Sequence, residues 1–178
     1  MVAVIDTSSL VSLVRYYLPF DKNKTLFGYI KERFEAKEII LLDAVYKECQ
    51  YTSKGIVISE LEYLKERKNQ VRTTELLPTR KFFNQLESQF INNSIRSRLT
   101  DLEFENRKNA FLDSADAKLI LYCLSRRDDL VIVTEETKSS NDNKSFKKIP
   151  AICHILKIRC ITLPELLNEY NGIDIEFK

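Results

Sequence analysis

The sequence predicts an α/β protein with a mainly parallel sheet, and three observations support this fold class. Short apolar runs rich in β-branched residues occur at residues 2–5, 38–42 and 130–134. These runs are apolar at successive positions, which is typical of parallel strands that are covered on both faces. Segments with the apolar spacing of helices lie between them. Strands that alternate with helices indicate a three-layer α/β/α arrangement.

The first strand, at 2–5, is followed by Asp6 and three hydroxyl residues, any of which could cap a helix. Helical spacing then continues to Leu18, and Pro19 ends it. Further helices are expected at 25–36, 44–50 and 58–68, the second of them directly after the strand at 38–42.

The middle of the chain, at about residues 60–112, shows no strand pattern. Because no linker flanks it, we interpret it as a helical insertion in a single domain of residues 1–178. Its main element is a helix expected at 80–99, which could also supply a homodimer or partner surface. The apolar face of that helix consists of Phe82, Phe83, Leu86, Phe90 and Ile91.

The last third of the chain returns to alternating helices and strands. Ser114 is expected to cap a helix that leads to the strand at 130–134. A polar loop at 135–148 and a short helix at 150–156 follow. A fourth strand is expected at 159–163, Pro164 suits the first turn of a last helix, and 173–177 could add an edge strand.

Composition narrows the class of protein without identifying a function. The 178 residues are 44% hydrophobic and 30% charged, which is typical of a globular domain. The net charge of +2 neither requires nor excludes a nucleic acid partner. Four cysteines without a CxxC pair and a single histidine do not make a zinc site. Without a signal peptide or a long apolar run, we expect a cytoplasmic protein with reduced cysteines and no membrane span.

Acidic residues stand where functional groups gather in parallel sheets, just past the carboxyl ends of strands. Asp6 follows the first strand, and Glu135 and Glu136 follow the strand at 130–134. Asp113 and Asp116 lie at the start of the helix before that strand, and Glu48 lies in the helix after the second strand. Carboxylates that share one cleft repel each other, and Mg²⁺ or Mn²⁺ relieves that repulsion. Each acid alone could equally be a helix cap or a solvated residue.

The order and surroundings of these acids resemble those of the PIN-domain nucleases. Val4-Ile5-Asp6-Thr7-Ser8-Ser9-Leu10 resembles the opening strand and first acid of that family. Asp113-Ser114-Ala115-Asp116 resembles its central acidic helix start, and Val133-Thr134-Glu135-Glu136 resembles its strand that ends in Thr, any residue, acid. The resemblance covers about 1–55 and 110–168. The middle helices are longer than in the compact toxin-type members. The segment Val133–Glu136, followed later by Lys148–Cys153, resembles a less characterised, longer subfamily.

The resemblance implies a metal-dependent endoribonuclease that acts on RNA. Many such relatives are toxins that an antitoxin protein neutralises. By this resemblance Asp6, Glu48, Asp116 and Glu136 are the catalytic acids. Asp6, Asp116 and Glu136 would hold Mg²⁺ or Mn²⁺. The residues implied to orient or support these groups are Thr7, Thr134, Glu135 and Asp113.

Two lysines near these acids, Lys118 and Lys138, are candidates for contact with RNA phosphates, although scattered lysines commonly serve solubility alone. The single histidine, His154, excludes a two-histidine ribonuclease mechanism.

Two departures from the family pattern keep alternatives open. The last acid of the family is usually Asp, and an aromatic residue follows it closely. In this sequence the corresponding acid is Glu136, and Phe146 comes much later. Glu135 competes with Glu136 for the role. A catalytically silent PIN-like module that binds RNA or a protein is therefore an alternative. A third interpretation is a receiver-like phosphotransfer protein that uses Asp6. This interpretation is weaker, because no second acid adjoins Asp6 and no phosphoacceptor Asp is expected to end a central strand.

Overall fold

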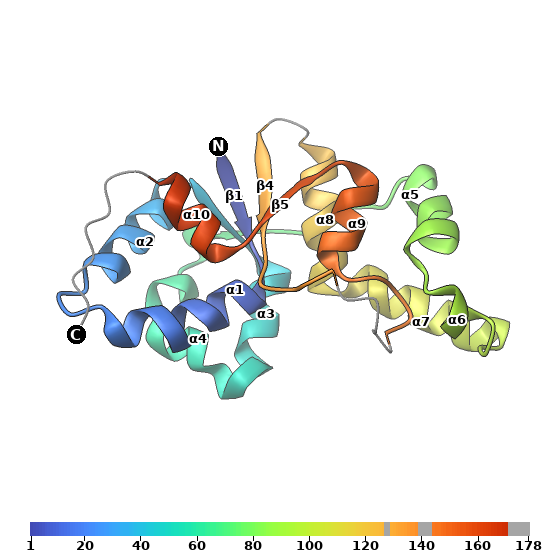
Figure 1. Ribbon diagram of the computed structural model, residues 1–178, viewed down its shortest axis with the longest axis horizontal. Coiled ribbons are helices and arrows are strands. Elements are labelled where there is room, and N and C mark those ends of the chain that lie inside the picture. Colours follow the sequence, from blue (N-terminus) through green and yellow to red (C-terminus); the bar gives the residue numbers. More distant parts are fainter. Residues whose placement is uncertain (127–128, 139–143, 171–178) are drawn as a thin grey trace.

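A five-stranded, all-parallel sheet forms the centre of the protein (Figure 1). The computed structural model describes residues 1–126, 129–138 and 144–170. The strand order is β3-β2-β1-β4-β5. The strands are β1 (Val2–Ile5), β2 (Ile39–Leu42), β3 (Gln70–Val71), β4 (Leu130–Val133) and β5 (Arg159–Ile161).

The α/β class and the parallel sheet are confirmed. Four of the strands lie where the apolar runs predict them, and the run at 173–177 lies outside the described residues. Ala3 pairs with Ile39 on one side of β1 and with Val131 on the other. Because β1 is in the middle of the sheet and helices flank it, Ala3, Val4 and Ile5 are buried.

The chain adds strands first on one side of β1 and then on the other, so the strand order changes direction between β1 and β4. From β1 the chain passes outward to β2 and β3, and it then returns to place β4 and β5 on the other side. The loops that leave the carboxyl ends of β1 and β4 therefore diverge, and such a switch point is where open parallel sheets bind ligands.

Helices of the first half follow the expected order. They are α1 (Thr7–Ser12), which continues through a π-helical turn (Leu13–Tyr17) and a 3-10 turn (Leu18–Phe20), α2 (Thr25–Glu35), α3 (Asp43–Tyr51) and α4 (Ile56–Glu60). The prediction of one helix at 58–68 is wrong, because α4 ends at Glu60 and is followed by two 3-10 turns, Glu62–Lys65 and Arg67–Asn69. Gly55 has a φ of 72°, and this left-handed conformation turns the chain between α3 and α4.

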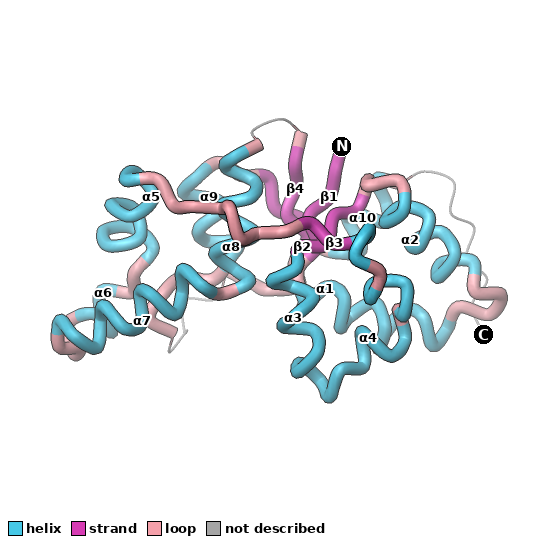
Figure 2. The backbone as a smooth tube through the Cα atoms, turned by 180° about the vertical axis from the view of Figure 1, so that it is seen from behind, coloured by secondary structure: helices cyan, strands magenta, loops and turns pink. Residues whose placement is uncertain are grey.

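The middle segment differs from its expectation in two ways. First, it contains β3, which pairs in parallel with β2, so the expected absence of a strand at 60–112 is wrong. Second, the helix expected at 80–99 is broken. It consists of α5 (Arg80–Gln85) and a π-helical turn (Leu86–Phe90), ends at Ile91, and is followed by the separate α6 (Asn93–Arg96). Figure 2 shows the long loop that runs from β3 to α5.

Ile91 ends the helix because it forms an antiparallel bridge with Phe146. The expected apolar face persists through the break, since Phe82, Leu86, Phe90 and Ile91 are all buried. A further helix, α7 (Asp101–Asp113), begins at a capping box formed by Thr100 and Glu103.

The last third follows the sequence closely. Ser114 caps α8 (Ala115–Ser125) by accepting the N–H of Ala117, as expected. The other two helices are α9 (Ile149–Leu156) and α10 (Leu163–Glu169). In Figure 1, α8 and α9 lie to one side of the strands, and α2 and α10 lie to the other. None of the helices in the described part of the chain is both long enough and apolar enough to cross a membrane.

Candidate active site

Asp6 is held by hydrogen bonds on both carboxylate oxygens. It is 4% exposed and caps α1, as the sequence predicts. Its Oδ1 accepts the backbone N–H of Thr7 at 2.7 Å. Its Oδ2 accepts the hydroxyls of Ser8 at 2.6 Å and Thr134 at 2.9 Å. Since a carboxylate oxygen has two lone pairs, Oδ1 keeps one for a further ligand.

Two hydroxyls connect Asp6 to the chain that leaves β4. Ser8 Oγ accepts the backbone N–H of Glu135 at 3.0 Å, and Thr134 Oγ1 accepts that of Glu136 at 3.2 Å. Each hydroxyl thus accepts a hydrogen bond from the segment after β4 and donates one to Asp6. This network fixes the carboxyl ends of β1 and β4 relative to each other.

Glu48 reaches the same region from α3. Its Oε2 accepts the hydroxyl of Thr7 at 2.5 Å, and Cys49 Sγ lies 3.9 Å from the same hydroxyl. Thr7 therefore contacts the carboxylate of Glu48, whereas Thr134 contacts that of Asp6. The Glu48 side chain otherwise extends toward solvent.

Asp116 is the acid on which the other charges act most strongly. It lies in the first turn of α8. Burial, followed by the negative charges of Asp6, Glu136 and Glu48, raises the pKa of Asp116 to about 7, while Lys144 opposes the shift. Such a shift arises where a carboxyl is removed from water and other carboxylates lie near it. The four acids of the sequence prediction are thus within electrostatic reach of one another at the start of α8.

Glu135 and Glu136 differ in their position relative to this cluster. Glu136 Oε2 accepts the N–H of Ile149 at 3.0 Å, and its Oε1 lies 3.6 Å from Lys144 Nζ. Glu135 Oε1 instead accepts the N–H of Leu163 at 2.6 Å. Only Glu136 of the two contributes to the raised pKa of Asp116. The geometry therefore favours Glu136 as the last acid.

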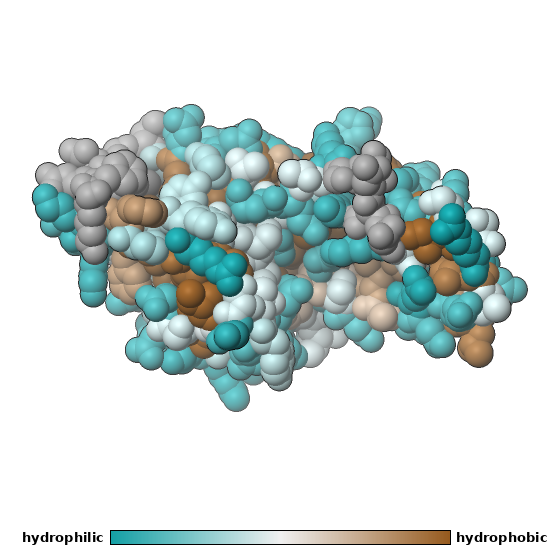
Figure 3. Space-filling model, turned by 60° about the horizontal axis from the view of Figure 1, so that its bottom comes forward, coloured by the Kyte–Doolittle hydropathy of each residue, from teal (hydrophilic) through white to brown (hydrophobic). Residues whose placement is uncertain are grey.

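Two hollows adjoin the start of α8, which is the lower end of that helix in Figure 1. One, of about 450 Å³, is lined by residues that include Glu48, Asp113, Ala115 and Lys118. The other, of about 240 Å³, is lined by Asp116 together with residues of α7 and of the segment 144–148. Consecutive residues, Ala115 and Asp116, thus face different hollows. Hydrophilic side chains cover most of the side of the molecule that Figure 3 brings forward.

The remaining candidates are Asp113, Lys118 and Lys138. Asp113 is exposed and lies beside Lys118 in the larger of these two hollows. Lys138 is exposed and lines neither hollow, and its charge acts on the thiol of Cys160.

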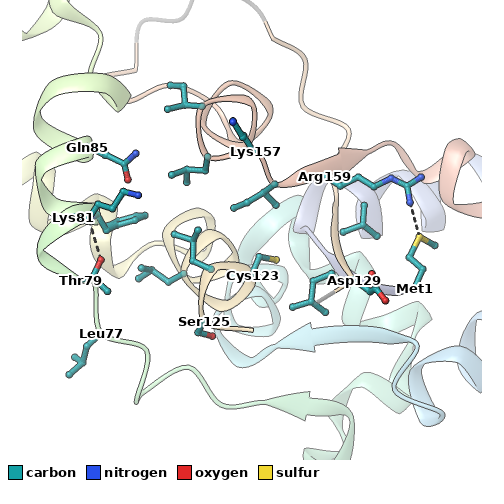
Figure 4. A pocket seen from close by; sticks show the side chains of 18 residues that line it. Met1, Leu77, Thr79, Lys81, Gln85, Cys123, Ser125, Asp129, Lys157 and Arg159 are labelled. Atoms are coloured by element: carbon teal, nitrogen blue, oxygen red, sulfur yellow. Dashed lines mark hydrogen bonds between the residues drawn. The ribbon is translucent and has the colours of Figure 1, made fainter. Parts of the chain in front are cut away.

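A hollow of about 990 Å³ lies at the opposite end of the sheet (Figure 4). Met1, Asp129 and Arg159, which begin or precede strands, form part of its lining. Catalytic groups of parallel sheets gather at the carboxyl ends instead, so its volume does not make it the functional site.

The sequence matches one protein family over residues 4–172, the family described as a domain of unknown function, DUF4411. The chain belongs to this family. All four acids fall within the matched residues. No curated protein matches the sequence.

The acids of this DUF4411 member can be tested against the metal that the sequence predicts. The donors are all carboxylate oxygens, which suits Mg²⁺ or Mn²⁺, and their negative charges add to the effect of burial in raising the pKa of Asp116. Within 1–126, 129–138 and 144–170, however, no three His, Cys, Asp or Glu side chains are arranged as a ready-made metal site. Glu48 and Glu136 each direct an oxygen to a protein donor instead. The donor chemistry fits, and a shared ion requires these two side chains to turn.

Two features of the site in this DUF4411 member were not expected. Ser8 contacts Asp6 directly, yet only its place two residues after the acid pointed to it. Asp6 also directly follows β1, which is the middle strand of the sheet, a position that the sequence did not show. The phosphotransfer alternative gains little from this, because a nucleophilic carboxylate must be accessible and Asp6 is 4% exposed.

Proposed function

We propose that this chain is a divalent-metal-dependent endoribonuclease of the PIN-domain kind. The observation that supports this most is the position of Asp116, where burial and then the negative charges of Asp6, Glu136 and Glu48 raise its pKa to about 7. Strongly shifted carboxyls at the carboxyl end of a parallel sheet are typical of functional sites. The resemblance in the order of the acids supplies the reaction class.

Each acid has a distinct part in this proposal. Asp6 and Asp116 would hold Mg²⁺ or Mn²⁺, with Glu136 as a further ligand and Glu48 at the edge of the site. When bound, the cation supplies an acidified water and neutralises charge on the phosphodiester. Ser8 and Thr134 keep the Asp6 carboxylate from rotating. Asp116 gives up its proton as the cation binds, since the positive charge lowers its pKa.

Positively charged side chains near the acids would bind the phosphates of a polyanionic substrate. Lys47 and Lys118 line the hollow that contains Glu48, and Lys118 lies only two residues from Asp116. Lysines beside a negative pocket offset the repulsion between the acids and RNA phosphates. RNA, rather than another phosphodiester, is proposed from the resemblance.

The test is cleavage of labelled single-stranded RNA with Mg²⁺ or Mn²⁺ by wild type and Asp116→Asn. Asp116→Asn should disturb the fold less than Asp6→Asn. Both carboxylate oxygens of Asp6 accept hydrogen bonds, and Asn at position 6 would replace one of them with an NH₂ group. The matched control is Asp129→Asn, at the opposite end of the sheet, where Asn tolerates the φ of 56°.

We expect wild type and Asp129→Asn to cleave RNA and EDTA to stop both. Asp116→Asn should be slower by a factor on the order of 100. Equal cleavage by Asp116→Asn and wild type would contradict the proposal.

A catalytically silent RNA-binding or protein-binding module is the second candidate. It is favoured by the hydrogen bonds that Glu135 and Glu136 make to helix starts, which are structural roles. Binding of RNA by wild type without cleavage in either metal would select this candidate.

We also propose, from the resemblance alone, that the protein is a cytoplasmic toxin with an antitoxin partner. Expression of wild type should then arrest growth, and expression of Asp116→Asn should not. Equal growth with both would reject the toxin role and leave the nuclease proposal intact.

A further inference from the structure

We infer that the hollow beside Asp116 is a subsite that holds the RNA phosphate next to the cleaved bond, with Arg107 as its main ligand. This inference rests on the ribonuclease function proposed above. It assigns a substrate-binding part to α7, which belongs to the middle segment rather than to the acid-bearing ends of the chain.

The lining of the hollow has an excess of positive charge. Its charged residues are Arg107, Lys144, Lys147, Lys148 and the single acid Asp116. A concentration of cations directly beside a group of carboxylates favours a polyanion that must approach those carboxylates. Lys144 joins the two regions, since it also lies near Glu136.

Arg107 is oriented by a hydrogen bond to Ser145, and it also interacts electrostatically with Glu103 of the same helix. One of its terminal nitrogens donates to Ser145 Oγ at 2.7 Å. That bond uses one of the five N–H donors of a guanidinium. The side chain belongs to an exposed residue, so the remaining donors can form the paired hydrogen bonds that phosphates accept.

Aromatic rings make the other wall of the hollow. The rings of Phe111 and Phe146 are 4.8 Å apart between centroids, and both residues line the hollow. Phe146 is buried, whereas Phe111 is half-buried. Because a nucleotide offers an apolar base and sugar next to its phosphate, this wall favours a nucleic acid chain over a free phosphate ion.

The wall is held by the middle segment. Phe146 bridges Ile91, and the backbone N–H of Lys147 donates to the carbonyl of Phe90 at 2.8 Å.

The two hollows lie on either side of the start of α8. A single-stranded RNA that passes from the Lys118 hollow across the start of α8 would reach Asp116 and then Arg107.

The inference is tested by binding of a fluorescein-labelled single-stranded RNA of about ten nucleotides in EDTA, where cleavage is absent. The variants are Arg107→Ala and Arg107→Lys. The matched control is Arg98→Ala, which removes the same charge from an exposed residue of the same segment outside the hollow. Affinity is measured over a range of salt concentrations, and thermal melting shows that each variant is folded.

We expect Arg107→Ala to bind about tenfold more weakly, as for loss of a hydrogen bond to a charged group. Its plot of log affinity against log salt should be shallower by about 0.7, the value for one lost single-strand phosphate contact. Arg107→Lys should restore the slope, because it keeps the charge, and Arg98→Ala should match wild type. A merely structural Arg107 would not change the slope.

The outcomes separate this inference from the proposed function. If Arg107→Ala has the affinity and slope of wild type while wild type cleaves RNA, the subsite is refuted and the nuclease stands. If the slope depends on Arg107 and wild type never cleaves with Mg²⁺ or Mn²⁺, the subsite stands and the nuclease does not. Absence of RNA binding by wild type overturns the subsite.

Discussion

Glu135 and Glu136 are consecutive residues whose carboxylates accept hydrogen bonds from the first residues of two different helices. Glu135 binds the N–H of Leu163 at the start of α10, and Glu136 binds that of Ile149 at the start of α9. Adjacent side chains of an extended segment point in opposite directions, so one acid faces the Asp116 region and the other does not. This division separates Glu136 from Glu135, which competes with it for the same role in the sequence.

The first prediction compares Glu136→Gln with Glu135→Gln. Glutamine keeps an oxygen for the helix N–H and removes the charge, so both variants should fold. We expect Glu136→Gln to slow RNA cleavage by at least about tenfold, in the range for altered metal ligands. Glu135→Gln should stay within about twofold in the same assay, because its carboxylate faces α10. The reverse ranking would show that Glu135 is the last acid.

The second prediction concerns pH in the absence of divalent cations. The pKa of Asp116 is raised to about 7 in the folded protein and is about 3.9 in an unfolded chain. Stability from this carboxyl is therefore fully present below about pH 4 and is lost as the pH rises through about 7. In EDTA, Asp116→Asn should melt at a higher temperature than wild type above pH 7, and the difference should vanish toward pH 4. A constant difference in Tm would contradict the raised pKa.

The third prediction follows from adding the cation at about pH 8, where Asp116 is ionised. Mn²⁺ should raise the Tm of wild type, because a ligand that binds only the folded state stabilises it, by about 2.7 kcal/mol at a hundred times its Kd. Asp116→Asn should show little of this increase, and Asp129→Asn should show all of it. Equal shifts in all three proteins would place the cation elsewhere.

The fourth prediction tests the two hydroxyls that hold Asp6. Ser8→Ala and Thr134→Val should each lower the free energy of unfolding by about 1–3 kcal/mol, since each leaves a backbone N–H and a buried carboxylate short of a partner. Thr134→Ser should recover most of the loss. Urea unfolding of the single and double variants measures the coupling, which must be non-additive if the hydroxyls act as one network.

The fifth prediction concerns the thiols, all of which are free. A hydrogen bond from Cys153 lowers the pKa of Cys160, whereas burial raises those of Cys49 and Cys123 to about 12. Iodoacetamide at neutral pH should therefore alkylate Cys160 first, as mass spectrometry can show. Cys153→Ala should slow this reaction by removing the donor. Faster labelling of Cys49 would contradict the prediction.

The sequence predicted β1, β2, β4 and β5 and missed β3, which is one of the two edge strands. β1, β2 and β4 leave continuous apolar runs because both of their faces are buried. β3 consists of only Gln70 and Val71 at the margin of the sheet, which is too short to show a period. The helix break at Ile91 depends on pairing with Phe146 from a distant part of the chain, so local spacing did not reveal it.

The candidate site was predictable in its acids and not in the groups that hold them. Asp6 could be found because it directly follows a buried strand, and Asp116 because it follows a capping serine. Ser8 was not found, because its part depends on the backbone of Glu135, which only the fold brings near. Arg107 was missed because α7 has no spacing that shows which of its residues face Asp116.

The hydrogen bond from Thr134 to Asp6 spans 128 positions of the chain. A ribosome therefore releases Asp6 and Glu48 long before it releases Asp116, Thr134 and Glu136. The nascent protein can form β1, β2 and β3 early, but the place beside β1 stays empty until β4 emerges. Under the proposed ribonuclease function, this order of synthesis would delay RNA cleavage until most of the polypeptide has left the ribosome.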